Sequence, residues 1–214
     1  MTDSPFLRAP GLDALGIEHG FGMIGSAEAA PRDVALARQV HGAVLARAPF
    51  DLRPDADAVW SAAAGAAVGV VTADCVPILL ADDRGTFVCA IHAGWRGTAA
   101  RIAARTVRAL ARATGAPPGR LVAAIGPHIG PCCYEVDEPV LAAIPARFVF
   151  EPVRPGHAML DLFAANRAQL VGAGVPARRI ERVGGCTACD STRYASWRRD
   201  RVSGRMVHFA RVPR

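Results

Sequence analysis

The stretch VGVVTADCVPILLADDRGTFVCAIHAGWRGT, residues 68–98, decides the fold of this chain. Its surroundings contain two strongly apolar segments, 66–71 and 86–91, which have the length and composition of buried strands. The first runs directly into the polar sequence TADC, and the second runs into HAGWRG. Because the ends of buried strands often present polar side chains to a cleft, we expect Cys75 and His92 to lie at neighbouring strand ends.

Further strands and helices are expected on both sides of this stretch. Short apolar segments predict strands at 17–24, 43–48, 121–125, 179–183 and 205–212. Apolar residues three and four apart predict a helix over 98–114, and shorter helical segments are expected at 138–143 and 160–172. The helix over 98–114 carries its arginines on the other side, which we interpret as a solvated face: Arg101, Arg105, Arg108 and Arg112.

The irregular alternation of strands and helices predicts the fold class. No internal repeat divides the chain, and no linker-like segment separates two parts of it. We therefore expect a single domain over residues 1–214, of the mixed α/β (α+β) class, a pattern that does not fix the type of sheet.

The composition limits the partners and the compartment. The chain has 214 residues and a net charge of +6, from 25 Lys plus Arg against 19 Asp plus Glu. This mild excess suits anionic small molecules, and without a dense basic run we expect no nucleic-acid partner. No apolar segment is long enough to cross a bilayer and the first residues show no signal pattern, so we expect a cytoplasmic monomer with no membrane contact. Six cysteines in such a chain are expected to be reduced thiols or metal ligands.

Three side chains next to strand-like segments form a candidate zinc site. His41, Cys75 and His92 offer two imidazoles and a thiolate, a donor set that suits Zn²⁺ and leaves a fourth position open. A bound Zn²⁺ would bring the pKa of a water towards neutrality. Their spacing matches no compact metal motif, so on spacing alone a buried Cys75 and two hydrogen-bonded histidines explain the sequence better.

The same residues also allow a reaction without a metal. Cys75 could act as a thiolate nucleophile that His92 activates. Asp74 could orient a histidine, although adjacent residues of a strand point to opposite sides.

The segment HAGWRGT at 92–98 is a candidate phosphate site. A glycine-rich turn before a helix presents free N–H groups, and Gly94 and Arg96 would hold the anion there. A tight turn in which Arg96 pairs with Asp74 or another acidic residue explains the same residues equally well.

Two clusters near the end of the chain are less specific. SWRRD at 196–200, with GRM at 204–206, could line a pocket through Trp197 or Arg198, or could be a loop held by Arg–Asp pairs. Cys186 and Cys189 form a CxxC, but Cys132 and Cys133 are adjacent rather than spaced, so we interpret the CxxC as coincidental. The remaining histidines are expected to be surface or core residues: His19, His128, His157 and His208.

Several motifs together resemble the laccase-domain family, whose members are also called polyphenol oxidases, peptidoglycan editing factors or purine nucleoside phosphorylases. The motifs are QVHG at 39–42, TADCVPILLAD at 72–82, HAGWRGT at 92–98, IGPHIGPCCYEV at 125–136, CT at 186–187 and SWRRD…SGRM at 196–206. The segment before QVHG is shorter than is usual in this family, and RYASW at 193–197 stands where FFSY is common.

The resemblance implies a function and a metal. It implies that His41, Cys75 and His92 are the zinc ligands of an active site. The fold that it implies is a single-domain mixed-sheet sandwich with flanking helices, similar to the deamidase domain of the cytotoxic necrotizing factors. It also implies phosphorolysis of adenosine, inosine and methylthioadenosine, adenosine deamination, and a link to peptidoglycan composition. Copper could also bind such a site in vitro, but a multicopper cluster needs His-x-His pairs, and none of the six histidines forms one.

The leading hypothesis is therefore a zinc-dependent purine nucleoside phosphorylase that takes a purine nucleoside and phosphate. In it His41, Cys75 and His92 bind the metal and carry the catalysis, and Gly94, Arg96 and Arg198 bind phosphate or substrate. The alternative is a metal-free Cys/His hydrolase or amidase that acts on peptidoglycan precursors. A third hypothesis is a non-enzymatic module that binds a small molecule or a protein, in which these side chains hold only a structural ion.

Overall fold

The two strands expected around residues 68–98 belong to different sheets in the computed structural model, which describes residues 4–201 and 204–214. The first sheet has five strands in the spatial order β1 (Phe6–Leu7), β2 (Glu18–Gly22), β14 (Met206–Arg211), β6 (Ala67–Thr72) and β3 (Val34–Leu36). The second has six, in the order β13 (Ile180–Arg182), β9 (Leu121–Ile125), β7 (Val76–Asp82), β8 (Val88–Ala93), β5 (Ala58–Ser61) and β4 (Leu45–Arg47).

Strand β7 is the central element that the sequence did not predict. It continues directly from the turn after β6, so the chain crosses from the first sheet to the second at residues 73–75. Pro77 argues against a central strand because proline cannot donate to the ladder. Its carbonyl instead accepts a hydrogen bond from the N–H of Gly126 at 2.9 Å, and Pro77 lies opposite His92 of β8.

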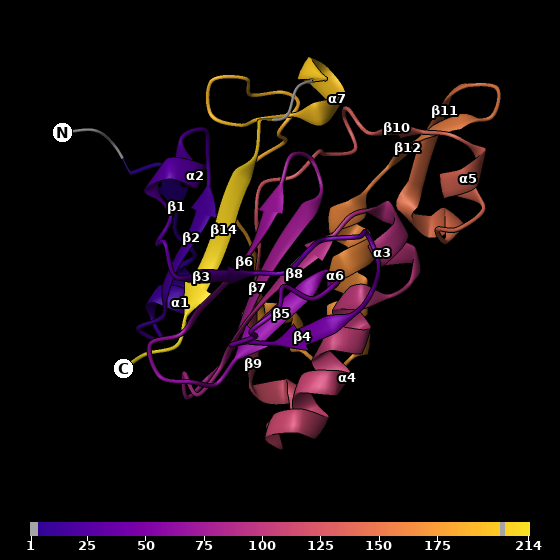
Figure 1. Ribbon diagram of the computed structural model, residues 1–214. Coiled ribbons are helices and arrows are strands. Elements are labelled where there is room, and N and C mark those ends of the chain that lie inside the picture. Colours follow the sequence, from indigo (N-terminus) through magenta and orange to yellow (C-terminus); the bar gives the residue numbers. More distant parts are fainter. Residues whose placement is uncertain (1–3, 202–203) are drawn as a thin grey trace.

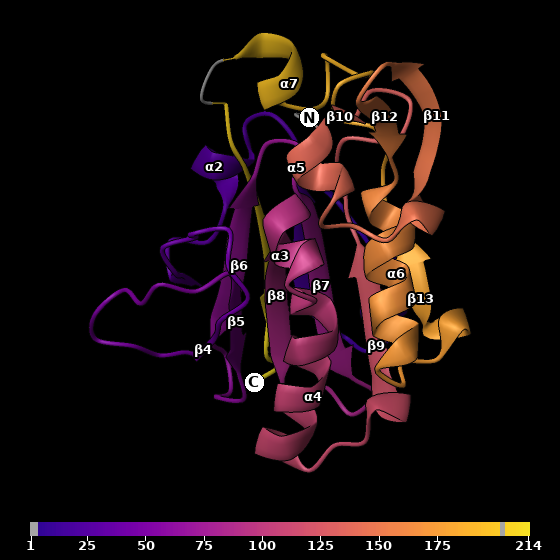
Figure 2. The same cartoon turned by 90° about the vertical axis from the view of Figure 1, so that its right-hand side faces the viewer.

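The two large sheets pack face to face, and helices cover the outer face of the six-stranded sheet (Figures 1 and 2). Alternation along β7 explains this layering, because successive side chains of a strand point to opposite faces. Leu79 and Ala81 pack with residues of the five-stranded sheet such as Val68. Ile78 and Leu80 belong to the core beneath the helices. The mixed-sheet sandwich with flanking helices that the family resemblance implies is therefore confirmed.

The helix expected over 98–114 is divided into two. Helix α3 (Trp95–Ala99) starts directly after β8, and α4 (Ile102–Thr114) follows it after a break at Arg101, whose φ is 62°. Helix α4 ends at Gly115, which has a φ of 73° and so adopts the left-handed conformation typical after a helix. The apolar face is buried as expected, and the arginines at 101, 105, 108 and 112 lie on its outer side.

The remaining elements gather around these layers. Helix α6 (Leu162–Gly172) packs beside α4 on the same face of the six-stranded sheet (Figure 2). A small antiparallel sheet that the sequence did not predict contains β10 (Glu135–Val136), β12 (His157–Leu160) and β11 (Val149–Arg154). The short helices are α1 (Pro10–Asp13), α2 (Ser26–Ala29), α5 (Glu138–Leu141) and α7 (Trp197–Asp200). None of the described helices has the length and apolar character that a membrane span requires.

Helix α7 and the small sheet lie at the same end of the molecule (Figures 1 and 2). Residues 73–75 and the carboxyl end of β8 meet there too, because Val76 pairs with Ala93. The expectation that Cys75 and His92 lie at neighbouring strand ends is confirmed, although β7 rather than β6 is the neighbour of β8.

Candidate active site and metal centre

The three side chains expected to bind zinc converge in the structure. The ligand atoms of His41, Cys75 and His92 all lie within 4.8 Å of one another. The two imidazole rings meet edge to face, with centroids 4.9 Å apart and planes 81° apart. His41 is exposed, Cys75 is half-buried and His92 is buried, so the group is open to solvent on the side of His41.

The loop before β4 positions His41 through a buried carboxylate. The backbone N–H groups of residues 40, 41 and 42 all donate to the side chain of Asp57, at 3.2, 2.9 and 2.7 Å. His41 itself has a φ of 59°, a left-handed conformation that this network holds. Asp57 is fully buried directly before β5, and it therefore fixes the loop to the six-stranded sheet.

The same carboxylate orients His92. The Nδ1 atom of His92 lies 2.8 Å from Oδ1 of Asp57. Because a carboxylate accepts, Nδ1 carries the proton and Nε2 is the nitrogen left to act as a ligand. A carboxylate behind a histidine is the usual partner of a metal-binding imidazole. Burial raises the pKa of Asp57, but the hydrogen bonds from His92 and from the N–H groups of Gly42 and Val40 outweigh burial and lower it.

The electrostatics of the group favour a thiolate at Cys75. Burial raises the pKa of this thiol, but hydrogen bonds from His41 and His92 outweigh burial and lower the pKa to about 7. Burial lowers the pKa of His92, and the contacts with Asp57 and Cys75 reverse this and raise it to about 9. The donor set is thus two imidazoles and a thiolate with a carboxylate behind one of them, which fits Zn²⁺ with one open coordination position.

The lack of a side chain at Gly94 leaves the space in which the three ligands meet. A Cβ atom at this position would lie 3.0 Å from Sγ of Cys75 and 3.2 Å from Cδ2 of His41. The φ of Gly94 is −70°, so its backbone conformation suits any residue and only the close approach requires glycine.

Replacing Gly94 with alanine is expected to weaken the site rather than the fold. The added methyl group displaces Cys75 and His41, so the zinc affinity should fall by roughly 10-fold, while the free energy of unfolding falls by about 1 kcal/mol. Zinc titration and chemical denaturation measure the two effects. Gly119→Ala is the matched control, because a Cβ there has nothing within 4 Å and should change neither quantity.

A cavity of about 480 Å³ lies against these three side chains. The turn at residues 71–75 forms one part of its wall, and the segments that contain Tyr134 and α7 form others. The lining residues beyond the three ligands are Gln39, Val71, Thr72, Ala73, Asp74, Ile129, Tyr134, Trp197, Arg198, Gly204 and Arg205. The cavity therefore combines aromatic and cationic groups beside a candidate metal site, as ligand pockets typically do.

Asp74 fixes the wall of the cavity rather than a histidine. Its carboxylate accepts hydrogen bonds from Oγ1 of Thr187 at 2.6 Å and from the backbone N–H of Arg198 at 2.7 Å. Asp74 has a φ of 88°, and its carbonyl accepts from the N–H of Ile129. The carboxylate of Asp74 is therefore bonded to Thr187 and Arg198, rather than paired with Arg96.

The predicted anion-binding residues lie at different distances from the cavity. Arg198 lines it, donates to the carbonyl of Glu135 at 2.8 Å and lies over the ring of Tyr134 at 5.2 Å. The exposed Arg96 stacks on Trp95, 4.4 Å from the ring centroid, and it is not among the lining residues. Both arginines affect the pKa of Tyr134. Burial and the charge of Cys75 raise this pKa to about 12, and the positive charges of Arg198 and Arg96 oppose the increase.

The other sequence expectations have mixed outcomes. His19, His128 and His208 are buried and hydrogen-bonded, as expected for core residues. The Nε2 atom of His208 lies 2.8 Å from Oγ1 of Thr72, which lines the cavity. The SWRRD segment both lines a pocket and forms an Arg–Asp pair, because Trp197 lines the cavity while Arg199 pairs with Asp200. Within the SGRM motif, Ser203 lies outside the described residues.

Asp57 is the functional residue that the sequence did not reveal. It stands in the sequence DADAVW with no motif around it, and its role arises from three backbone N–H groups some 15 residues earlier in the chain. A lone aspartate before a strand carries no signal of such a network.

Comparisons with known proteins are consistent with this geometry. The model of the family described as multi-copper polyphenol oxidoreductase laccase matches residues 22–212. The chain belongs to this family. The family description names a multicopper enzyme, whereas the histidines of this chain form no His-x-His pair.

Members of the multi-copper polyphenol oxidoreductase laccase family that resemble this chain carry the names of nucleoside enzymes. A purine nucleoside phosphorylase of Xylella fastidiosa (strain 9a5c) is 40% identical over 185 residues, covering 81% of this chain and 70% of that protein. Adenosine deaminase RL5 of an unknown prokaryotic organism is 45% identical over 149 residues, covering 67% of this chain and 56% of that protein. The crystal structure of the hypothetical protein YfiH of Bacillus licheniformis has a TM-score of 0.89 at 27% identity, covering 99% of this chain and 98% of the other.

Proposed function

We propose that this chain is a zinc-dependent purine nucleoside phosphorylase, with adenosine deamination as a companion activity. The observation that carries the proposal is the convergence of His41, Cys75 and His92 to within 4.8 Å in the wall of a 480 Å³ cavity. The names of the relatives support the choice of substrate.

The cavity offers groups for both halves of a nucleoside. Tyr134 and Trp197 present aromatic surfaces, on which a purine base can stack. Arg198 and Arg205 bring positive charge to the same cavity and suit the phosphate. Gly94 and Arg96, at the adjacent turn, remain proposed contributors to phosphate binding.

The proposed phosphorolysis exchanges one bond for another. A phosphate oxygen bonds to the anomeric carbon, and the purine leaves with the electron pair of the C–N bond. The proton that the phosphate loses balances the proton that the purine gains. Arg198 and Arg205 hold the phosphate against the sugar, which makes the attack effectively intramolecular. Zinc, when bound, supplies a positive charge and a Lewis acid beside the reacting atoms.

The companion deamination would use the same cavity. A water oxygen bonds to C6 of the purine, and the amino group leaves as ammonia. Asp57 contributes to either reaction indirectly, by holding His92 in the tautomer whose Nε2 faces the other ligands.

Removal of zinc tests this proposal. After treatment with a strong chelator, phosphate-dependent cleavage of adenosine or inosine is expected to fall by roughly 100-fold or more, and added zinc should restore it. The measurement is the formation of ribose 1-phosphate and free base, with circular dichroism to verify that the chelated protein stays folded. Full turnover by folded protein from which all metal has been removed would contradict the proposal.

A second candidate is a metal-free hydrolase or amidase, with peptidoglycan precursors as its proposed substrates. One observation favours it: Asp57, His92 and Cys75 lie in the order of a carboxylate, an imidazole and a nucleophilic thiol. In this reaction the Cys75 sulfur would attack a carbonyl carbon, and the amine would leave with a proton from His92. A water would then attack the resulting thioester, which releases the carboxylic acid and regenerates the thiol of Cys75. In such a triad His41 only helps to lower the pKa of Cys75. His41→Ala would therefore weaken this hydrolase in part, whereas it would remove the activity of the zinc enzyme.

A further inference from the structure

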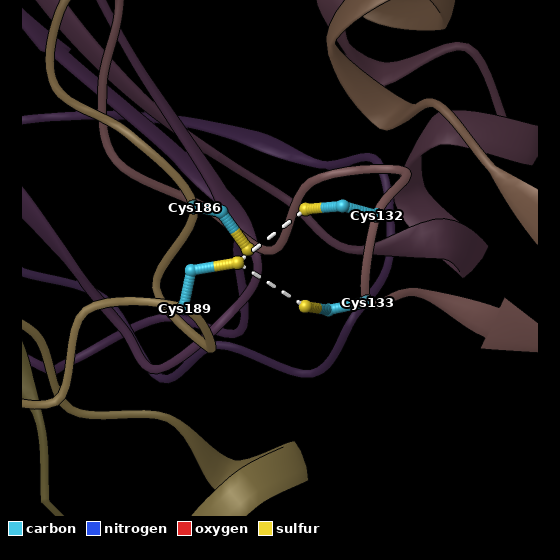
Figure 3. Close-up of side chains that lie close together, drawn as sticks. All are labelled: Cys132, Cys133, Cys186 and Cys189. Carbon is cyan, nitrogen blue, oxygen red and sulfur yellow. Dashed lines mark hydrogen bonds between the residues drawn. The ribbon is translucent and has the colours of Figure 1, made fainter.

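Four of the six cysteines form a second cluster, and none of these four is among the residues that line the cavity. Their sulfur atoms all lie within 4.8 Å of one another: Cys132, Cys133, Cys186 and Cys189. Figure 3 shows the four side chains pointing towards one another from two segments of the chain. The sequence-based interpretation of Cys186 and Cys189 as a coincidental CxxC is therefore wrong, because a second pair of thiols faces them.

A turn allows two adjacent cysteines to point in the same direction. Successive side chains alternate in a strand, but residues 131–133 form turns between β9 and β10. The N–H groups of Cys133 and Tyr134 both donate to the carbonyl of Gly130, at 3.0 Å. Both sulfurs consequently face Cys189, whose Sγ lies 3.5 Å from Sγ of Cys132 and 3.4 Å from that of Cys133.

The backbone around Cys186 is arranged to stabilise a thiolate. The N–H of Gly130 donates to the Cys186 sulfur at 3.2 Å. A Cβ atom on Gly130 would lie 3.3 Å from Cβ of Cys186 and 3.4 Å from Sγ of Cys132, so glycine permits the two segments to approach.

We propose that these four cysteines bind a structural zinc ion, distinct from the ion proposed at His41, Cys75 and His92. Four thiolates in tetrahedral arrangement are a common structural zinc site, in which protein ligands occupy every position. With zinc–sulfur distances near 2.3 Å, tetrahedral ligands would lie about 3.8 Å apart. The sulfur of Cys189 lies 3.5 and 3.4 Å from those of Cys132 and Cys133, and all four sulfurs lie within 4.8 Å of one another, so small shifts would complete the coordination.

The geometry favours an ion over disulfide bonds. Cys189 lies almost equally close to two sulfurs, and it can form a disulfide with only one of them. A central cation uses all four sulfurs near their present spacing, whereas each disulfide would require two of them to close to about 2.05 Å.

The ion would fix two segments that form the wall of the cavity. Cys133 directly precedes Tyr134, and Cys186 directly precedes Thr187, whose hydroxyl donates to Asp74. The carbonyl of His128 also accepts a hydrogen bond from the N–H of Thr187 at 3.0 Å. The zinc ion would therefore join the segment of Tyr134 to the segment that leads to α7.

Zinc stoichiometry of matched variants tests the inference. Protein purified with zinc and without a chelator is analysed for metal per chain. We expect two zinc ions in the wild type, one in Cys75→Ala, one in Cys189→Ser and none in the double variant. Cys89→Ala is the control, because Cys89 is a buried cysteine outside both clusters, and it should keep two ions.

The outcomes separate this inference from the proposed function. Zinc that Cys189→Ser loses and Cys75→Ala retains supports the four-cysteine site, whether or not the enzyme activity is found. If Cys189→Ser keeps all the zinc of the wild type, the inference is overturned.

A second measurement does not depend on the folding of Cys189→Ser. Cobalt(II) added to Cys75→Ala protein should give the intense thiolate-to-cobalt absorption of a site with several sulfur ligands. Cobalt-loaded protein that lacks this absorption overturns the inference. So does mass spectrometry after denaturing alkylation, if it finds these cysteines as disulfides in protein that was purified under reducing conditions.

Discussion

Asp57→Ala is expected to have the largest effect on stability of any substitution at the candidate site. The change leaves three backbone N–H groups and the buried imidazole of His92 without their acceptor. Breaking a buried, hydrogen-bonded charge network of this kind typically costs about 3–5 kcal/mol of unfolding free energy. Zinc affinity should fall by roughly 10–100-fold as well, because Asp57 orients one ligand and the loop of another. Denaturant unfolding and zinc titration measure the two effects.

Asp55→Ala is the matched control for this prediction. Asp55 is two residues earlier, but it is exposed, and its carboxylate pairs with Arg38 at the surface. Exposed ion pairs contribute about 0–1 kcal/mol, so this variant should unfold and bind zinc almost as the wild type does. If the two variants behaved alike, Asp57 would not have the organising role that we assign to it.

Cys75→Ala is expected to have the largest effect on activity. The substitution removes the one sulfur ligand of the triad and leaves two imidazoles, which form a much weaker zinc site. Phosphate-dependent cleavage of adenosine should fall by roughly 100-fold or more, with a loss of stability near 1 kcal/mol because Cys75 is only half-buried. Steady-state kinetics with adenosine and phosphate measure the first effect, and thermal unfolding measures the second.

Cys89→Ala is the matched control for this prediction. Burial raises the pKa of Cys89, which lies in the core beneath the helices and has no histidine beside it. Cys89→Ala should therefore retain activity, although it also replaces one cysteine with alanine. Wild-type turnover by folded Cys75→Ala protein would exclude both the zinc mechanism and the thiolate mechanism.

The fold could be predicted where local pattern decides structure. The apolar segment at 121–125 is strand β9, with the predicted bounds, and the amphipathic pattern around 102–114 forms α4. The sequence failed where long-range pairing decides structure. Strand β7 contains Pro77 and follows a polar turn, so only its position between β8 and β9 identifies it as central. The transfer of the chain between two sheets at residues 73–75 also has no local signal.

The candidate site shows the same division. The motifs that contain His41, Cys75 and His92 can be recognised in sequence, because each is a short and distinctive group of residues. Asp57 could not be identified, since its four hydrogen bonds come from the backbone of a loop and from a different strand. The four-cysteine cluster was missed because adjacent cysteines match no zinc motif, and only the turn at 131–133 directs both towards Cys186 and Cys189.

Anomalous scattering at the zinc absorption edge tests the central claim most directly. Crystals of protein purified without a chelator should show a peak about 2.3 Å from Sγ of Cys75 and about 2.0–2.1 Å from one ring nitrogen each of His41 and His92. The peak should vanish when data are collected below the edge. Crystals of zinc-loaded, folded protein with no peak among these three side chains would contradict the account.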